Sequence, residues 1–165
     1  MKIKTLILAL SLICFGLSAQ VDKTAVTTDF INGWATDEKH ESLMEHFSPN
    51  MVFTWPGGGN WPDGNDESLK QFWGFYTQHC KRYKARIIDL EVRELDNESY
   101  AFFSWEATVL VDEENPDFIG TTAIGPGTYR LIWEGDKIKH LEFYADSGGR
   151  QAQHEKQAAE KKAKK

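Results

Sequence analysis

The spacing of the apolar residues changes once along this chain, just after Cys80, and the change limits what the chain can fold into. Before it, four large apolar residues recur at the period of an amphipathic helix: Leu69, Phe72, Trp73 and Tyr76. After it, apolar and polar residues alternate one by one, which is the period of a strand. We therefore predict helices in the first half of the chain and strands in the second.

The strand half divides into four runs, which we expect over residues 88–93, 101–111, 121–134 and 138–145. Turn residues separate the runs at 96–98 and 134–137, and Gly-Pro-Gly at 125–127 marks a bulge or bend. Strands that follow helices are typical of an α+β domain. The order predicts helices packed on one face of a curved antiparallel sheet.

The first half also carries two further helices and a glycine-rich loop. One helix is expected over 22–36, and a shorter one over 37–47. A short strand is expected at 51–55. Residues 56–66 then hold four glycines and two prolines, which predicts a loop. A long loop with a large aromatic residue inside a small domain is often functional.

Both ends differ from the body. Residues 1–20 combine two lysines with a short apolar run that ends at small residues, the pattern of a secretory signal peptide. A lipoprotein signal at Cys14 is the alternative. The apolar run is too short to span a membrane, so we expect a secreted or periplasmic protein without a membrane span. The mature chain then keeps only Cys80, and no internal disulfide.

The formal net charge of -6 hides an acidic body. Residues 21–149 hold 11 Lys and Arg against 23 Asp and Glu, a net of -12, whereas residues 150–165 are basic. An acidic body disfavours nucleic acid as a partner. We expect one domain over 21–149 and a solvated helical or disordered tail over 150–165. A contact between this tail and an acidic surface is the alternative.

Three stretches match the pattern of one known superfamily: FSPNMVFTWPGG, NDESLKQFWGFY and YRLIWEGDKIKHLEFYAD. They resemble the NTF2-like superfamily, and within it the SnoaL-like and ketosteroid-isomerase-like proteins, over residues 22–150. The resemblance implies an α+β cone, in which a strongly curved antiparallel sheet wraps N-terminal helices around a pocket. Members include isomerases, cyclases, dehydratases and non-catalytic binders, and many dimerise through the sheet. A homodimer and a small-molecule ligand are therefore implied.

Two catalytic positions of the steroid isomerases are not matched. Their carboxylate base precedes the proline after the first short strand, where this chain has Trp55 before Pro56. Their tyrosine on the first helix corresponds to Phe30, which has no hydroxyl to donate. Both differences argue against steroid isomerisation.

The closing strand offers other acid–base candidates. Its even positions are Ile138, His140, Glu142, Tyr144 and Asp146, and strand alternation puts them on one face. By the resemblance this set faces the pocket, where burial would raise a carboxylate pKa toward neutrality. His140 and Glu142 are then the catalytic candidates. In the alternative, the more apolar odd set faces the core.

Ligand contacts are expected from aromatic and acidic side chains around the pocket: Trp55, Trp61, Tyr129, Tyr144 and Asp146. Arg130 is expected either to pair with Glu106 or to grip a ligand carboxylate. No metal or cofactor is expected, because no ligand motif occurs. The hypothesis is an exported domain that binds a small, mainly apolar ligand, with cofactor-free isomerase, dehydratase or cyclase chemistry left open. The alternative is a non-catalytic dimerisation or interaction module of the cell envelope.

Overall fold

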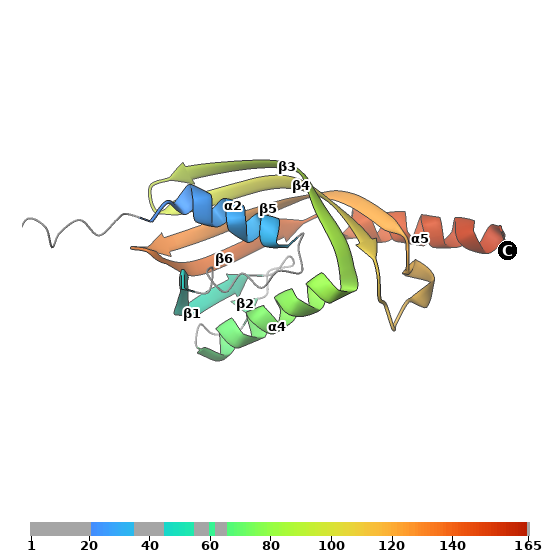
Figure 1. The fold of residues 1–165 in the computed structure, drawn as a ribbon, viewed down its shortest axis with the longest axis horizontal. Helices are drawn as coiled ribbons and strands as arrows, with labels where there is room; N and C mark the ends of the chain where they lie inside the picture. Colours follow the sequence, from blue (N-terminus) through green and yellow to red (C-terminus); the bar gives the residue numbers. More distant parts are fainter. Residues whose placement is uncertain (1–20, 35–44, 55–59, 62–65, 165) are drawn as a thin grey trace, which may run out of the picture.

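The computed structural model describes residues 21–34, 45–54, 60–61 and 66–164 (Figure 1). Its elements in chain order are α2 (Lys23–Gly33), β1 (Phe47–Thr54), β2 (Asn60–Trp61), α4 (Asp66–Arg82), β3 (Tyr83–Leu95), β4 (Glu98–Val109), the short 3-10 helix η1 (Pro116–Phe118), β5 (Thr122–Glu134), β6 (Lys137–Ala145) and α5 (Ser147–Ala163). No helix within the described ranges is both long enough and apolar enough to cross a membrane. The predicted signal peptide lies outside the described residues.

The strands form one sheet of six, in the order β2-β1-β6-β5-β4-β3. Strands β3 to β6 are the predicted antiparallel meander, and β2 is antiparallel to β1. Strand β1 runs parallel to β6, because it enters the sheet before helix α4 and joins it beside the last strand. The α+β prediction is confirmed, and the expectation of a wholly antiparallel sheet is corrected to a mixed one.

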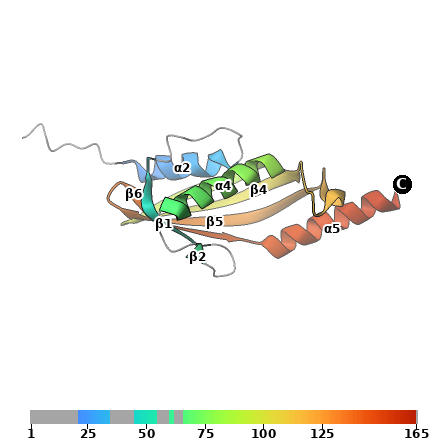
Figure 2. The same ribbon diagram turned by 90° about the horizontal axis from the view of Figure 1, so that it is seen from below.

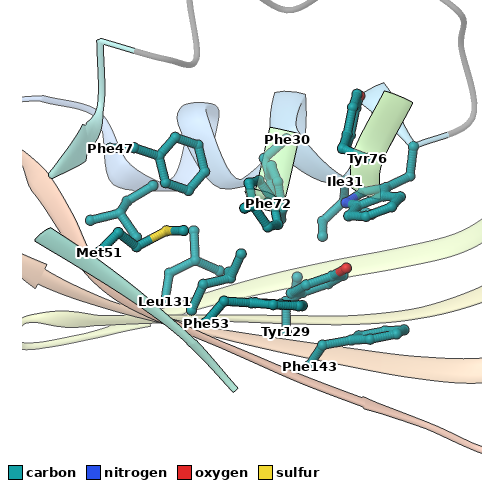
Figure 3. Packing of buried hydrophobic residues seen from close by; sticks show 14 of the residues in the cluster. Phe30, Ile31, Phe47, Met51, Phe53, Phe72, Tyr76, Tyr129, Leu131 and Phe143 are labelled. Carbon is teal, nitrogen blue, oxygen red and sulfur yellow. The ribbon is translucent and has the colours of Figure 1, made fainter. Parts of the chain in front are cut away.

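Helices α2 and α4 cover the same face of the sheet (Figure 2). Between these helices and the sheet lies an aromatic core, in which Phe30 of α2 and Phe72 of α4 contact each other, with ring centroids 6.2 Å apart. Figure 3 shows both rings above Leu131, Phe53 and Tyr129, which rise from the strands. Burial of such large apolar side chains is the main favourable contribution to folding.

Helix α2 begins where the sequence predicts. The Asp22 carboxylate accepts a hydrogen bond from the Ala25 backbone N–H at 2.9 Å and so caps the first turn. The predicted second helix over 37–47 lies mostly outside the described residues. Its last residue, Phe47, belongs instead to β1, where it pairs with Ile138 of β6. Strand β1 therefore starts four residues earlier than expected.

The basic tail forms helix α5, one of the two expected states, and most of its residues are exposed, but one of its faces docks on β5. Strand β6 pairs with β5 only from Gly127 onward, which leaves the first residues of β5 without a strand on that side. The Gln157 amide of α5 fills the place by accepting from the Thr122 N–H at 2.9 Å and donating to the Thr122 carbonyl. The Gln153 amide likewise accepts a hydrogen bond from the Ile124 N–H and donates one to the Ile124 carbonyl. The boundary expected at residue 150 therefore cuts through an element that is part of the domain.

Candidate functional site

A cavity of about 290 Å³ lies between α4, the helix-covered face of the sheet and the start of α5. Seven aromatic side chains form most of its wall: Trp34, Phe75, Tyr83, Phe103, Trp105, Tyr129 and Phe143. Gln78, Arg82 and Ser147 line the cavity and are exposed, so it opens to solvent between α4 and α5. Most of the wall is therefore suited to the flat face of an organic molecule.

Helix α4 supplies the polar side of the cavity from one of its faces. Phe75, Gln78, His79 and Arg82 are spaced i, i+3, i+4 and i+7, so they share a stripe along the helix. The helix ends at Arg82 and passes directly into β3 at Tyr83, whose side chain also lines the cavity. The same helical period that buries Phe72 and Tyr76 therefore also places His79 at the cavity wall.

His79 lies among aromatic rings. Its imidazole stacks on Trp105, with ring centroids 5.2 Å apart, and meets Trp34 edge to face at 5.0 Å. Burial lowers the pKa of His79 to about 3, and the positive charges of Arg150 and Arg82 act in the same direction. The imidazole is therefore neutral across the physiological range.

Arg150 reaches the cavity from the first turns of α5. Its guanidinium carbon lies 3.9 Å from the centroid of the Trp105 ring, within the range of a cation–π contact. The side chain passes over Gly125 of β5, where an added Cβ would lie 3.0 Å from the Cγ and Cδ atoms of Arg150. Burial lowers the pKa of Arg150. Gly125 therefore leaves the space through which this arginine reaches Trp105.

Several polar atoms of the cavity residues have no hydrogen-bond partner in the described part of the chain. These buried atoms are Trp34 Nε1, His79 Nε2, Trp105 Nε1 and Arg150 Nε. Buried polar atoms in proteins are normally hydrogen-bonded, because leaving one unpaired costs about 1–3 kcal/mol. Four such atoms around one cavity are polar groups that a molecule inside it can reach.

Tyr129 of β5 packs in the aromatic wall. Its ring stacks on Phe143 of β6 with centroids 4.5 Å apart, and on Phe103 of β4 at 6.0 Å. Burial raises the pKa of Tyr129 well above its ordinary value. Its phenol is therefore a neutral hydrogen-bonding group at the cavity. Three of the five residues predicted for ligand binding have described side chains, and of these Tyr129 lines the cavity whereas Tyr144 and Asp146 do not.

The structure was compared with known proteins. No protein-family model and no curated protein matches the sequence. Solved structures do match in shape. An NTF2-like protein from Anabaena variabilis is 20% identical over 76% of this chain and 87% of its own, with a TM-score of 0.59. The fold is NTF2-like.

Two candidate polyketide cyclases share this NTF2-like fold. The one from Xanthomonas campestris pv. campestris is 16% identical, covers 79% of this chain and 98% of its own, and has a TM-score of 0.63. The one from Streptomyces antibioticus is 12% identical over 81% of this chain and 98% of its own, with a TM-score of 0.66. At such low identity the likeness establishes the NTF2-like fold and leaves the chemistry to the residues of the cavity.

Beyond Lys139, the closing strand of this NTF2-like sheet turns its odd positions toward the helices, which is the alternative stated for this strand and not the orientation that the resemblance implies. Leu141 and Phe143 are buried under the helices, whereas Tyr144 is 53% exposed. The register of β5 and β6 shifts between Ile132 and Trp133, so Lys139 is an extra residue and alternation changes parity there. This bulge puts both Ile138 and Leu141 in the core, and moves the later even positions outside.

His140 and Glu142 therefore cannot reach a ligand in the NTF2-like cavity. His140 Nε2 is 2.7 Å from Thr54 Oγ1, on the outer side of the sheet. Glu142 Oε2 is 3.2 Å from Arg130 NH1, and Tyr144 donates a hydrogen bond to the same carboxylate. The placement of the catalytic pair inside the pocket is corrected.

The other predicted site residues also lie elsewhere. Asp146 caps α5 by accepting a hydrogen bond from the Gly149 N–H at 2.8 Å. Trp55 lies outside the described residues, and Trp61 is described only through its backbone pairing with Phe53.

The predicted Arg130–Glu106 ion pair is replaced by other pairs on the outer face. Arg130 NH2 lies 2.5 Å from Glu98 Oε1, and the same guanidinium also pairs with Glu142. Glu106 pairs instead with Arg86 of β3, at 3.2 Å. Arg130 therefore has two carboxylate partners of its own and is not available to a ligand in the cavity.

Sequence reasoning missed His79 and Arg150 as cavity residues. A signal for His79 was present, because it continues the helical spacing of Phe72 and Tyr76. Arg150 had no comparable signal: its place depends on how α5 folds back on β5.

Proposed function

We propose that this NTF2-like domain binds a small, mainly apolar ligand in the cavity between α4, the sheet and α5. The observation that supports the proposal is the cavity itself, whose wall is largely aromatic. Its volume of about 290 Å³ is at the lower end of ligand pockets, roughly 300–1,000 Å³, and suits a molecule of one or two rings.

The side chains of the cavity favour binding over proton transfer. A general base works best when its pKa is near the working pH, and that of His79 is about 3. Tyr129 is a weak acid, because burial raises its pKa. Isomerase, dehydratase or cyclase chemistry without a cofactor would need an acid–base group in the cavity, and these two buried groups are poorly matched to that role near neutral pH. Catalysis of this kind is the second candidate function. Two structural neighbours are candidate polyketide cyclases, and they support it only through the shared fold.

Binding can be tested with 2-naphthol, a neutral two-ring probe, by isothermal titration calorimetry. In the Ala145→Phe variant the added ring fills the cavity, because Ala145 lines it. We expect the purified protein to bind 2-naphthol and this variant to lose the binding. Tyr144→Phe, at the neighbouring position on the outer face, is the matched control and should bind normally. Equal binding by Ala145→Phe and the parent protein would place the probe elsewhere and refute the proposal.

We also propose that the domain is exported, which the signal-peptide pattern of residues 1–20 supports. An intact mass of the secreted or periplasmic form should show a chain that begins near residue 20. A full-length mass from the cytoplasm of the native host would contradict export.

A dimer through the outer face of the sheet is the alternative function, and one observation favours it. Phe102, Ile124 and Tyr144 are exposed on that face, by 42%, 48% and 53%. Exposed apolar side chains that gather on one face mark an interaction surface. The partner we propose is a second copy of the chain.

A further inference from the structure

Arg150 is the one arginine in the described part of the chain with no aspartate or glutamate oxygen within 4.0 Å of its guanidinium, and the charge of Asp146 acts on it only from a longer distance. The other four each lie within 4.0 Å of an aspartate or glutamate: Arg82, Arg86, Arg93 and Arg130. The body of this protein is rich in acidic residues, so an arginine that stays unpaired and half-buried is conspicuous. An arginine removed from water is costly unless an anion compensates its charge.

The guanidinium of Arg150 is positioned to hold such an anion. Its central carbon lies over the Trp105 ring, 3.9 Å from the ring centroid, and this contact holds the guanidinium at the cavity wall. Its Nε is buried and has no partner among the described residues. The edge of a guanidinium matches a carboxylate with two parallel N–H···O bonds, and stacking on an aromatic ring leaves that edge free.

The charged side chains that line the cavity are all positive in the described part of the chain. Arg82, the second cation of the lining, is tied to Asp112 with its NH2 2.5 Å from Oδ2. His79 between them is neutral and offers Nε2 to a polar group. In the described part of the chain, no acidic side chain lines the cavity. An anion that enters therefore meets an arginine without an ion-pair partner, and the nearby Asp146 is not among the lining residues.

We propose that the cavity selects small aromatic carboxylates, with the carboxylate bound by Arg150 and the ring held between Trp34, Trp105 and Tyr129. This inference rests on the proposed binding function and names the chemical class of its ligand. Gly125 contributes by leaving room for the Arg150 side chain.

The test compares 2-naphthoate with 2-naphthol, two probes with the same rings that differ in charge. In the parent protein, 2-naphthoate should bind roughly 10- to 100-fold more tightly, the usual range for a hydrogen-bonded charge. Arg150→Gln should remove that preference, so that the two probes bind with similar affinity. Arg93→Gln, an exposed arginine on β3, is the control for the loss of one positive charge and should keep the preference.

A second variant tests position rather than charge. Gly125→Ala keeps Arg150 but places a methyl group against its side chain, so 2-naphthoate affinity should fall by more than 2-naphthol affinity. An undiminished preference for 2-naphthoate in this variant would contradict the role given to Gly125. The thermal midpoint of each variant reports whether it has folded.

The outcomes separate the two proposals. If 2-naphthol binds and the preference for 2-naphthoate is absent, or survives in Arg150→Gln, the carboxylate inference is wrong and the binding function stands. If neither probe binds the folded parent protein, both are wrong.

Discussion

At the scale of single residues, His79 and Arg150 depend on the same tryptophan. The imidazole stacks on Trp105 at 5.2 Å, and the guanidinium lies on it at 3.9 Å. Two positive charges cannot be held so close in a buried place without a large cost. Burial above all, and the charge of Arg150 in addition, lower the pKa of His79 to about 3, so the imidazole beside Arg150 stays neutral.

This lowered pKa predicts how stability depends on pH. Unfolded His79 takes up a proton near pH 6.5, but folded His79 does so only near pH 3. The unfolded state therefore binds more protons between these values, and the free energy of unfolding falls as the pH falls. The loss due to one such histidine is up to about 1.4 kcal/mol per pH unit. His154, whose pKa is also lowered by burial, acts in the same direction.

Urea unfolding at pH 6.5, 5.5 and 4.5 measures the effect. His79→Phe keeps an aromatic ring on Trp105 and removes the titration, so its stability should fall less steeply than that of the parent protein. His154 is unchanged in both proteins and cancels from the comparison. Parallel curves for the two proteins would show that His79 does not titrate abnormally.

At the scale of elements, the sequence predicted most of the helices and strands but not which way the last strand faces. The helix from Asp66 and the strands β5 and β6 begin and end within about two residues of their expected positions. These elements were predictable because apolar period and turn residues are local signals. The bulge at Lys139 was not predictable, because an extra residue in one strand is defined by its pairing with the partner strand, here β5. It reversed the orientation of His140 and Glu142.

The tail was misjudged for a related reason. Its sequence has almost no apolar stripe, so hydrophobic pattern alone predicts a solvated helix. Docking depends instead on Gln153 and Gln157, whose amides pair with the open edge of β5. The sequence of a helix does not show that its glutamines will pair with a strand edge, because that edge is 29 or more residues away in the chain.

Hydrogen exchange tests this docking. In Gln157→Ala the Thr122 N–H loses its acceptor, and its exchange should become at least tenfold faster, equivalent to about 1.4 kcal/mol of lost protection. Gln151→Ala is the control, because Gln151 lies on the exposed side of α5 and pairs with Glu155. Unchanged exchange at Thr122 in Gln157→Ala would mean that the helix is not held through this amide.

At the scale of the whole molecule, the two faces of the sheet have different characters. The helix-covered face holds the aromatic core and the cavity. The outer face carries ion pairs across three strands, in which Arg130 of β5 binds Glu98 of β4 and Glu142 of β6. Beside them lie the exposed rings of Phe102 and Tyr144. The outer face is therefore suited to contact with another protein surface rather than to small-ligand chemistry.

Sedimentation velocity tests whether that contact is a homodimer. We expect a dimer at micromolar concentration for the parent protein and a monomer for Phe102→Asp, because a charge buried in an apolar interface is costly. Leu95→Asp is the matched control: Leu95 is 63% exposed but lies at the far end of β3. A parent protein that sediments as a monomer would exclude the dimer under these conditions.

The passage of Arg150 over Gly125 has a consequence for how such a domain can diversify. The strands and α4 encode the shape of the binding site, whereas α5 encodes its charge, and the two are separate stretches of chain that meet only after folding. A change at position 150 removes one contact with Trp105 but alters no residue of the strands or of α4. Descendants of a common ancestor can thus exchange one chemical class of ligand for another in a single mutational step.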